Sequence, residues 1–410
     1  MRSFDENLSL YAKLAIEVGV NLQPGQRLSI GAPLQAAGYV RSLVRQAYAA
    51  GAYDVHVDWH DDETGLTRLL MAPDAALRDV PNWLVSKHET LMEQRAARIS
   101  VYAPTPGLLK DVDPKRLASS TLAQQKAMKR VQDATMVTKS SWLVISPATP
   151  AWAAEVYPDE APEEALNHLW DEIFRLCRID REDPIGAWRE HVEDLGRRAA
   201  FLNERRFRRL HYEGPGTDLR IELPPRHVWQ SARETDELGV PCVVNLPTEE
   251  VFTLPTRDGV DGTVVASMPL NYEGVTVEGI RLTLRRGEIV DYTAEKGLEA
   301  LRSIIETDEG ARRLGEVALV SQDSPIAATG RLFYNTLYDE NSSCHLAIGD
   351  AYPTCIEGGR DMSEEELTAE GRNHSMAHVD FMIGSDRLNV TAEDASGGLV
   401  PLLREGRWAF

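Results

Sequence analysis

Carboxylates and imidazoles, the side chains that a hydrolytic metal site requires, gather in one stretch of this chain. Glu340 and His345 open and close the hexapeptide ENSSCH, and the tripeptide HVD (residues 378–380) follows downstream. In a β-strand, residues two apart project from the same face, so His378 and Asp380 can reach one metal ion while Val379 turns into the interior. A lone His-x-Asp occurs by chance in many proteins, so the neighbouring residues carry most of the weight.

The complete candidate set consists of four carboxylates and two imidazoles: Glu250, Glu316, Glu340, His345, His378 and Asp380. Two divalent ions bring four positive charges, which four carboxylates neutralise, and the nitrogen ligands favour zinc, cobalt or manganese over calcium or magnesium. Such a pair of ions, about 3.5 to 4 Å apart, polarises a scissile carbonyl and activates a water. Spacing alone leaves the alternative of isolated, solvated glutamates open.

Other polar residues support weaker hypotheses. Cys344 beside His345 suggests a cysteine hydrolase, but consecutive side chains diverge in direction and no separate base is visible, so we expect a small buried thiol. His374 either supports a ligand or substrate or is a loop histidine. His56 and His60 are expected to be structural, and the alternative is that their strand end faces an active-site cleft between the domains. The sequence contains no GxSxG, P-loop or GxGxxG fingerprint, which removes the commonest serine-hydrolase and nucleotide-binding alternatives.

Composition excludes several classes of function. A net charge of −20 argues against nucleic acid and anionic membranes as partners, because both attract basic surfaces. The four cysteines have no CxxC spacing, which predicts neither a zinc knuckle nor a disulfide framework and fits a reducing compartment. Without an apolar leader or a run of about 18 apolar residues, we expect a cytoplasmic protein.

The pattern along the chain predicts two domains. Residues 1–190 alternate short apolar runs with helical periodicity, which indicates an α/β domain with a largely parallel sheet. Residues 191–410 read as an α+β domain of antiparallel hairpins that carries the metal site. The first domain is expected to have a helix at 34–50 and strands at 28–30, 54–59, 98–102 and 142–145. The second is expected to have a helix at 295–314 and strands at 219–223, 263–268, 279–285 and 288–292.

Several segments in a fixed order carry a resemblance to a known family. They are GPGTDL (214–219), NLPTEEVFT (245–253), GEVALV (315–320), ENSSCH (340–345), GDAY (349–352) and HVD (378–380). In these segments the chain resembles the M29 family of metallo-aminopeptidases, also called the thermophilic aminopeptidase or aminopeptidase S/T family, over nearly its whole length.

The resemblance implies a two-domain enzyme that releases N-terminal amino acids from peptides with a free N-terminus. It also implies two divalent metal ions per chain (zinc, cobalt, manganese or magnesium) and a homodimer. The family's metal positions fall on Glu250, Glu316, Glu340, His345, His378 and Asp380, with Glu316 as the bridge. Tyr352 falls on a catalytic tyrosine.

Two further roles follow from the chemistry. Glu249 is a candidate for the carboxylate that takes a proton from the attacking water and delivers it to the leaving amine. Adjacent residues of a strand face opposite ways, so Glu249 and Glu250 both point inward only if the backbone after Pro247 is irregular, and a solvent-facing Glu249 is the alternative. Tyr352 can donate its hydroxyl to the developing oxyanion; otherwise it is a core or lid tyrosine.

Two other functions compete with a dinuclear aminopeptidase. A metal-dependent amidohydrolase acting on small non-peptide amides would need the same metal cluster. A non-catalytic metal-binding or peptide-binding protein is disfavoured, because structural metal sites are closed, usually four-coordinate and cysteine-rich.

Overall fold

The computed structural model describes residues 2–272 and 274–410, and the chain divides into two compact units. The first unit comprises Met1–His191 and Arg233–Pro247, and the second comprises Val192–Ala232 and Thr248–Phe410. Helix α9 (Pro184–Arg205) belongs to both, because the division falls within it. A division into domains at residues 190 and 191 stays a prediction.

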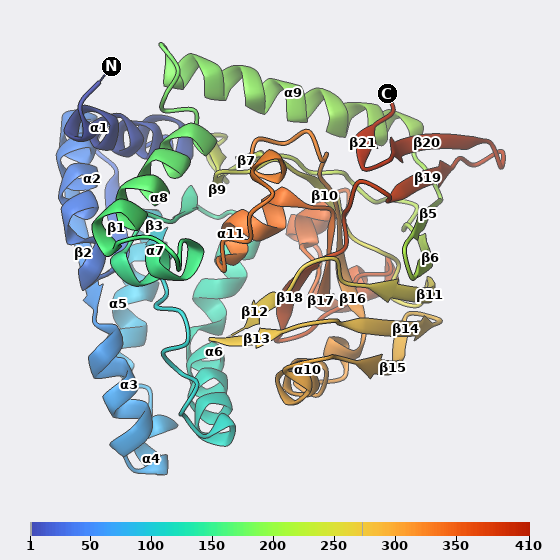
Figure 1. Cartoon of the computed structure of the whole chain (residues 1–410), viewed down its shortest axis with the longest axis horizontal. Coiled ribbons are helices and arrows are strands. Elements are labelled where there is room, and N and C mark those ends of the chain that lie inside the picture. The colour runs from blue at the N-terminus through green and yellow to red at the C-terminus, as the bar shows by residue number, and fades with distance from the viewer. Residues whose placement is uncertain (1, 273) are drawn as a thin grey trace. The chain divides into compact units, whose positions relative to one another are not determined.

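The first unit is built on a parallel sheet, as its alternating pattern predicts (Figure 1). The order of the five strands is β2-β1-β3-β4-β9. Their bounds are β1 Arg27–Pro33, β2 Asp54–His60, β3 Ala97–Val101, β4 Trp142–Ile145 and β9 Asn245–Leu246. The last strand, which no sequence pattern predicts, returns from far along the chain to pair with β4. A short hairpin, β7 (Arg233–Thr235) with β8 (Pro241–Val243), lies just before it in sequence.

Helices cover both faces of this sheet. Gly19, in the π-helical turn Ala15–Gly19, lies against Leu143 on one face. On the other face, residues of α5 and α6 line a recess together with Trp142. The helices are α1 Phe4–Leu14, α2 Ala37–Ala49, α3 Asp62–Met71, α4 Asp74–Leu77, α5 Asn82–Glu93, α6 Pro114–Met136, α7 Pro150–Val156 and α8 Pro162–Leu176. No helix in the described part of the chain combines the length and the apolar character that a membrane crossing needs.

The second unit contains two antiparallel sheets and a hairpin. The larger sheet has the order β15-β14-β11-β6-β5-β19-β20-β21, and the smaller has the order β10-β16-β17-β18. The strands of the larger sheet are β5 Arg209–Gly214, β6 Thr217–Glu222, β11 Val260–Val265, β14 Arg281–Arg285, β15 Glu288–Thr293, β19 Asn389–Glu393, β20 Leu399–Arg404 and β21 Arg407–Trp408. Those of the smaller sheet are β10 Val251–Thr253, β16 Leu314–Leu319, β17 His345–Gly349 and β18 His378–Met382. The hairpin joins β12 (Leu270–Tyr272) to β13 (Val275–Val277), and the helices are α10 Leu298–Ile305, α11 Thr336–Asp339 and α12 Glu364–Ala369.

The predicted helix at 295–314 is wrong in extent, because α10 ends at Ile305 and strand β16 already begins at Leu314. Asp308 ends the helical pattern: its carboxylate accepts hydrogen bonds from the backbone N–H groups of Ala311 and Met376. Gly310 then lies so close to the carbonyl of His374 that an added Cβ would approach it to 1.8 Å. Contacts with a distant segment thus override the local helical periodicity.

Candidate metal centre

The four-stranded sheet β10-β16-β17-β18 brings most of the candidate ligands onto one face. Directly paired residues of antiparallel strands point to the same side. Glu316 pairs with Ala347, which pairs in turn with Asp380, so the two carboxylates flank a methyl group. His345 lies two residues before Ala347 on β17 and shares its face. His378 joins them, because it pairs with Gly349, two residues beyond Ala347.

Small residues on the central strand leave room between the ligands. Ala347 contributes only a methyl group at the middle of this face, and Gly349 contributes no side chain. Gly349 has a φ of +107°, and an added Cβ would meet the carbonyl oxygen of Ala377 at 2.1 Å. Both the backbone conformation and the close approach therefore require glycine at this position.

The opposite face of the same sheet is apolar core. Val317, Leu346 and Val379 alternate with the polar residues and are buried. The predicted strand register is confirmed, because His378 and Asp380 are both half-buried on one side of β18 and Val379 turns to the other.

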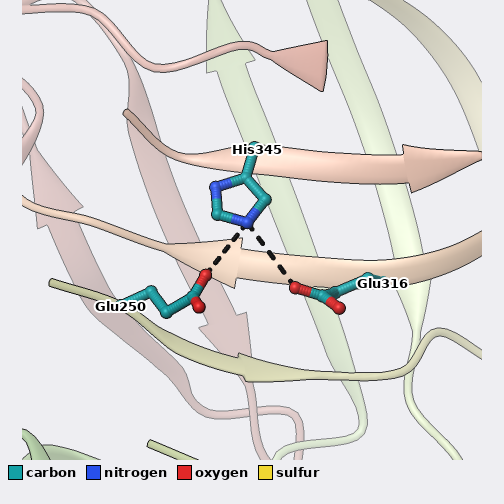
Figure 2. A group of neighbouring side chains, drawn as sticks. All are labelled: Glu250, Glu316 and His345. Carbon is teal, nitrogen blue, oxygen red and sulfur yellow. Dashed lines mark ion pairs between the residues drawn. The ribbon is translucent and has the colours of Figure 1, made fainter. Parts of the chain in front are cut away.

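Glu316 lies at the centre of the cluster, with its two oxygens facing different histidines. Its Oε1 lies 3.5 Å from Nε2 of His345, and its Oε2 lies 3.6 Å from Nε2 of His378. Glu250 approaches the first histidine, with Oε2 3.0 Å from the same Nε2 atom, and Figure 2 shows both carboxylates converging on that imidazole. Asp380 approaches the second, with Oδ1 3.6 Å from Nε2 of His378. The side chains thus form two triads that share Glu316.

Backbone carbonyls hold both imidazoles with Nε2 directed at the carboxylates. Nδ1 of His345 lies 2.9 Å from the carbonyl oxygen of Glu340 and 3.0 Å from that of Ser343. Nδ1 of His378 lies 2.8 Å from the carbonyl oxygen of Asp350. A carbonyl only accepts, so each Nδ1 carries its proton and donates it. In the neutral rings, the lone pair is therefore on Nε2, the atom that would coordinate a metal.

The electrostatics of the cluster show an excess of buried negative charge. Burial raises the pKa of Glu316 to about 7, and the neighbouring carboxylates of Asp380 and Glu250 add to the increase. Burial works against a charged His345, yet hydrogen bonding to Glu250 and Glu316 holds the pKa of its imidazole well above the ordinary value. Both pKa shifts have the same cause: without metal cations, the closely spaced carboxylates favour protonation of Glu316 and of the neighbouring His345.

Two buried oxygens in this cluster lack a hydrogen-bond donor. When His345 is neutral and protonated on Nδ1, its Nε2 atom, 3.0 Å from Oε2 of Glu250, has no proton to donate, and Oδ1 of Asp380 accepts no hydrogen bond from any described residue. An anionic oxygen without a donor is costly to bury, and a divalent cation bound to it removes that cost. The residues present therefore fit metal ions, with oxygen and imidazole nitrogen ligands in the mixture typical of zinc, cobalt and manganese sites.

Glu340 borders this cluster but lies outside the two triads. It occupies the 3-10 turn Glu340–Ser342. Burial raises its pKa well above the ordinary value, and the charges of Asp380 and Glu250 add to the effect, which places Glu340 in the same electrostatic environment. Its Oε1 lies 3.4 Å from Nδ2 of Asn341.

Asn341 links the turn that contains Glu340 to the segment that contains Glu249 and Glu250, and no sequence pattern pointed to it. Its Oδ1 accepts a hydrogen bond from the backbone N–H of Glu249 at 2.8 Å, and its Nδ2 donates to the carbonyl oxygen of Leu337 at 2.9 Å. Thr248 to Glu250 precede strand β10 in irregular backbone, and both glutamates are 7% exposed. The solvent-facing alternative for Glu249 is therefore wrong, while its role as a base stays a prediction.

Tyr352 lies beside the second histidine. The centroid of its ring is 5.3 Å from that of His378, at an edge-on angle, and 5.7 Å from that of Phe252. Burial and the charges of four carboxylates, with Glu316 first among them, raise the pKa of Tyr352 well above its ordinary value. The phenol therefore keeps its proton and can donate it in a hydrogen bond.

The remaining candidates have structural environments. Cys344 is buried, as expected; its Sγ donates to the carbonyl oxygen of Val320, and burial raises the pKa of the thiol to about 11. His374 contacts the carboxylate of Asp350 at 3.1 Å rather than either triad. In the first unit, His56 lies 3.0 Å from Asp58.

A second residue that sequence analysis missed is Arg372, whose guanidinium is buried. It donates to both carboxylate oxygens of Asp350, at 3.0 and 3.1 Å, and to the carbonyl oxygen of Ala351 at 2.6 Å. Asp350 supplies the carbonyl that orients His378, and Ala351 directly precedes Tyr352. Asp350, Ala351 and Tyr352 belong to the segment GDAY, which the family resemblance singled out, but no local pattern points to Arg372.

Comparisons with known proteins agree with this chemistry. Residues 4–408 match the family model described as thermophilic metalloprotease (M29). The chain is 47% identical to Aminopeptidase 2 of Geobacillus stearothermophilus, over 100% of this chain and 99% of the relative. It is also 47% identical to Aminopeptidase AmpS of Bacillus subtilis, over the full length of both.

A solved structure shares the fold. Wild-type AmpT from Thermus thermophilus superimposes with a TM-score of 0.93 at 42% sequence identity, and the match covers 100% of each chain. Three findings lead to one assignment: the family model matches almost every residue, the relatives have nearly the same length, and the structure contains a cluster of buried carboxylates and imidazoles. The chain belongs to the M29 family of thermophilic metalloproteases and is a metal-dependent peptidase.

Proposed function

We propose that this protein is a dinuclear metal-dependent aminopeptidase. The observation that carries the proposal is the position of Glu316, whose two oxygens face two separate histidines at 3.5 and 3.6 Å. A carboxylate in this position can serve two cations at once. Two adjacent cations held by a shared carboxylate are typical of hydrolases that cleave amide bonds.

The proposed ligands follow the two triads. Glu250, Glu316 and His345 would hold one ion, and Glu316, His378 and Asp380 would hold the other. Glu340 completes the set, which then contains four carboxylates against the four positive charges of two divalent ions. Zinc, cobalt, manganese and magnesium are the proposed ions, and the imidazole nitrogens favour the first three.

Bound divalent ions supply Lewis-acid polarisation of the scissile carbonyl and lower the pKa of water toward neutrality. The chain's own residues do the rest. Tyr352, whose phenol stays protonated, donates a hydrogen bond to the oxygen on which negative charge develops. Glu249 accepts a proton from the attacking water and passes it to the leaving amine. The backbone carbonyls behind both imidazoles keep the rings in position throughout the reaction.

The proposed substrates are peptides with a free N-terminus. The relatives at 47% identity carry the name aminopeptidase. Physical chemistry supports the same substrate, because a desolvated cluster of carboxylates stabilises an amine or ammonium and offers an acetamide no matching partner. The protein is further proposed to be a cytoplasmic homodimer. Its four cysteines are buried, which fits a reducing compartment.

The decisive experiment compares free and N-acetylated versions of one peptide with metal-stripped and metal-reconstituted protein. We expect hydrolysis only after addition of zinc, cobalt, manganese or magnesium, with residues released one at a time from the free peptide. Mass spectrometry of the products reads out the cleavage order. Equal rates on both peptides, or cleavage at internal bonds, would refute the aminopeptidase. Amino-acid amides and non-peptide amides in the same assay test the alternative of a small-molecule amidohydrolase.

A further inference from the structure

The parallel sheet of the first unit carries one polar row where an apolar row is expected. Parallel strands with both faces covered usually read as continuous hydrophobic runs. Ser29 on β1 pairs with Arg98 on β3, which pairs with Trp142 on β4. Residues of α5 and α6 line this side of the sheet, so the row does not simply face bulk solvent. A local departure from the fold's own pattern often marks a functional site.

This polar row forms the floor of a recess that is rich in hydrogen-bond donors. Besides these three residues, His88 of α5 and Lys139, just beyond α6, line the recess, and its lining contains no carboxylate. The space in this recess that the centre of a water molecule can occupy is about 40 Å³. One water requires roughly 10 to 15 Å³ by this measure, so the recess holds about three waters or one small polyatomic ion.

Arg98 is the most informative residue of the recess. Among the residues that the structure describes, no carboxylate forms an ion pair with its guanidinium, and desolvation lowers its pKa. The residue itself is exposed, so water also solvates part of the guanidinium. A guanidinium offers five N–H donors in a planar fork that matches the oxygens of a carboxylate or phosphate. Because no carboxylate of the described residues occupies these donors, they are available to an anion that enters the recess.

The surrounding charges do not neutralise the recess. The carboxylate of Asp58 acts on His88, but it is already bound by Lys87 and, at 3.0 Å, by His56. Burial lowers the pKa of His88, and the positive charges of Lys87 and Arg98 lower it further, while the charge of Asp58 raises it.

We propose that this recess is a binding site for a small oxyanion, with Arg98 as its principal ligand and Lys139 as the second. The oxyanion is the size of inorganic phosphate, sulfate or a single carboxylate group. The site lies wholly within the first unit and uses none of the proposed metal ligands, so it is separate from the peptidase centre.

Isothermal titration of inorganic phosphate into the metal-stripped full-length protein tests the proposal. Removal of metal prevents phosphate from binding at the peptidase centre, and constant ionic strength, set with sodium chloride, removes general charge effects. Saturable binding of one phosphate per chain is expected, with parallel titrations of sulfate and acetate to separate a tetrahedral from a planar ligand. We expect Arg98→Met to weaken binding at least about tenfold, as loss of a charged hydrogen-bonding partner does.

Arg27→Met is the matched control. Arg27 also lies in the parallel sheet, on β1, but it pairs with Asp54 at 3.1 Å and does not line the recess. Phosphate binding should be unchanged in this variant. No saturable binding to the wild-type protein, or equal binding by the Arg98→Met variant, would overturn the proposal.

Thermal unfolding separates a binding role from a structural one. If Arg98 is retained for an anion, Arg98→Met should unfold at the same or a higher temperature than the wild type in chloride buffer, and phosphate should stabilise only the wild type. A large loss of stability in chloride, with an undiminished phosphate effect, would contradict the inference. Lys139→Met provides an independent test of the same site should Arg98→Met fail to fold, and an unchanged phosphate affinity in it would count against the proposal.

Discussion

Replacement of Glu316 by glutamine tests the dinuclear centre most directly. The amide has nearly the shape of the carboxylate but lacks its charge, and both oxygens of Glu316 face a histidine of a different triad. A unit charge about 4 Å from another contributes about 4 kcal/mol at an effective dielectric constant of about 20, which corresponds to about three orders of magnitude in affinity. The amide dipole retains part of this interaction. We therefore expect each of the two metal affinities to fall by about two to three orders of magnitude.

Elemental analysis after dialysis, together with peptide hydrolysis at saturating substrate, measures the effect. The variant should retain well under two metal ions per chain and should lose hydrolysis almost completely, while circular dichroism shows an intact fold. Glu288→Gln is the control, because Glu288 is an exposed carboxylate on β15 and should keep both metals and full activity. Two bound ions and near-normal turnover in Glu316→Gln would rule out a bridging carboxylate.

Three further predictions concern the surroundings of Glu316. His378→Ala and Asp380→Ala should each lose metal and activity while the fold is preserved. Val379→Ala should instead lower the free energy of unfolding by about 1 kcal/mol and leave metal affinity intact. Calorimetry and elemental analysis measure these effects, and a larger loss of metal affinity in Val379→Ala than in the other two variants would show that the strand register is wrong. Arg372→Gln should lower kcat more than it changes KM after full metal loading, because Arg372 holds the segment before Tyr352, the proposed catalytic tyrosine. An equal kcat with a lowered Tm would reduce Arg372 to a structural residue. In metal-free protein, burial and neighbouring carboxylates raise the pKa of Glu316 to about 7, so the folded state binds this proton more tightly than the unfolded state. The resulting stability is present below about pH 4.5 and is lost as pH rises through about 7. A metal ion replaces the proton, so the gain in Tm on metal addition should grow between about pH 5 and about pH 8; a gain independent of pH would contradict this linkage.

Local sequence determined the strands that have a clear alternation or apolar run. Strand β4 has the predicted bounds, Trp142–Ile145, because a short apolar run ends at a proline-rich turn. The HVD segment also has the predicted orientation, since the side-chain period of a strand is two wherever the strand pairs. These properties depend on neighbours in sequence, so a pattern of residue types is enough to predict them.

Residue types also determined much of the candidate chemistry before any fold was available. The residues Glu316, His345, His378 and Asp380 could be selected because carboxylates and imidazoles suit divalent metals. That selection says nothing about distance. The triads exist because β16 pairs with β10 and β17, and β17 pairs with β18.

Tertiary structure alone decided which polar groups support the site and where some elements end. Arg372 donates a hydrogen bond to the carboxylate of Asp350, and Asn341 accepts one from the backbone N–H of Glu249. The partners in each pair are far apart in sequence. The termination of α10 well before residue 314 and the pairing of β9 with β4 likewise depend on distant contacts. Local periodicity carries no information about such partners, because hydrogen bonds and burial with remote residues contribute free energies as large as the local preferences they override.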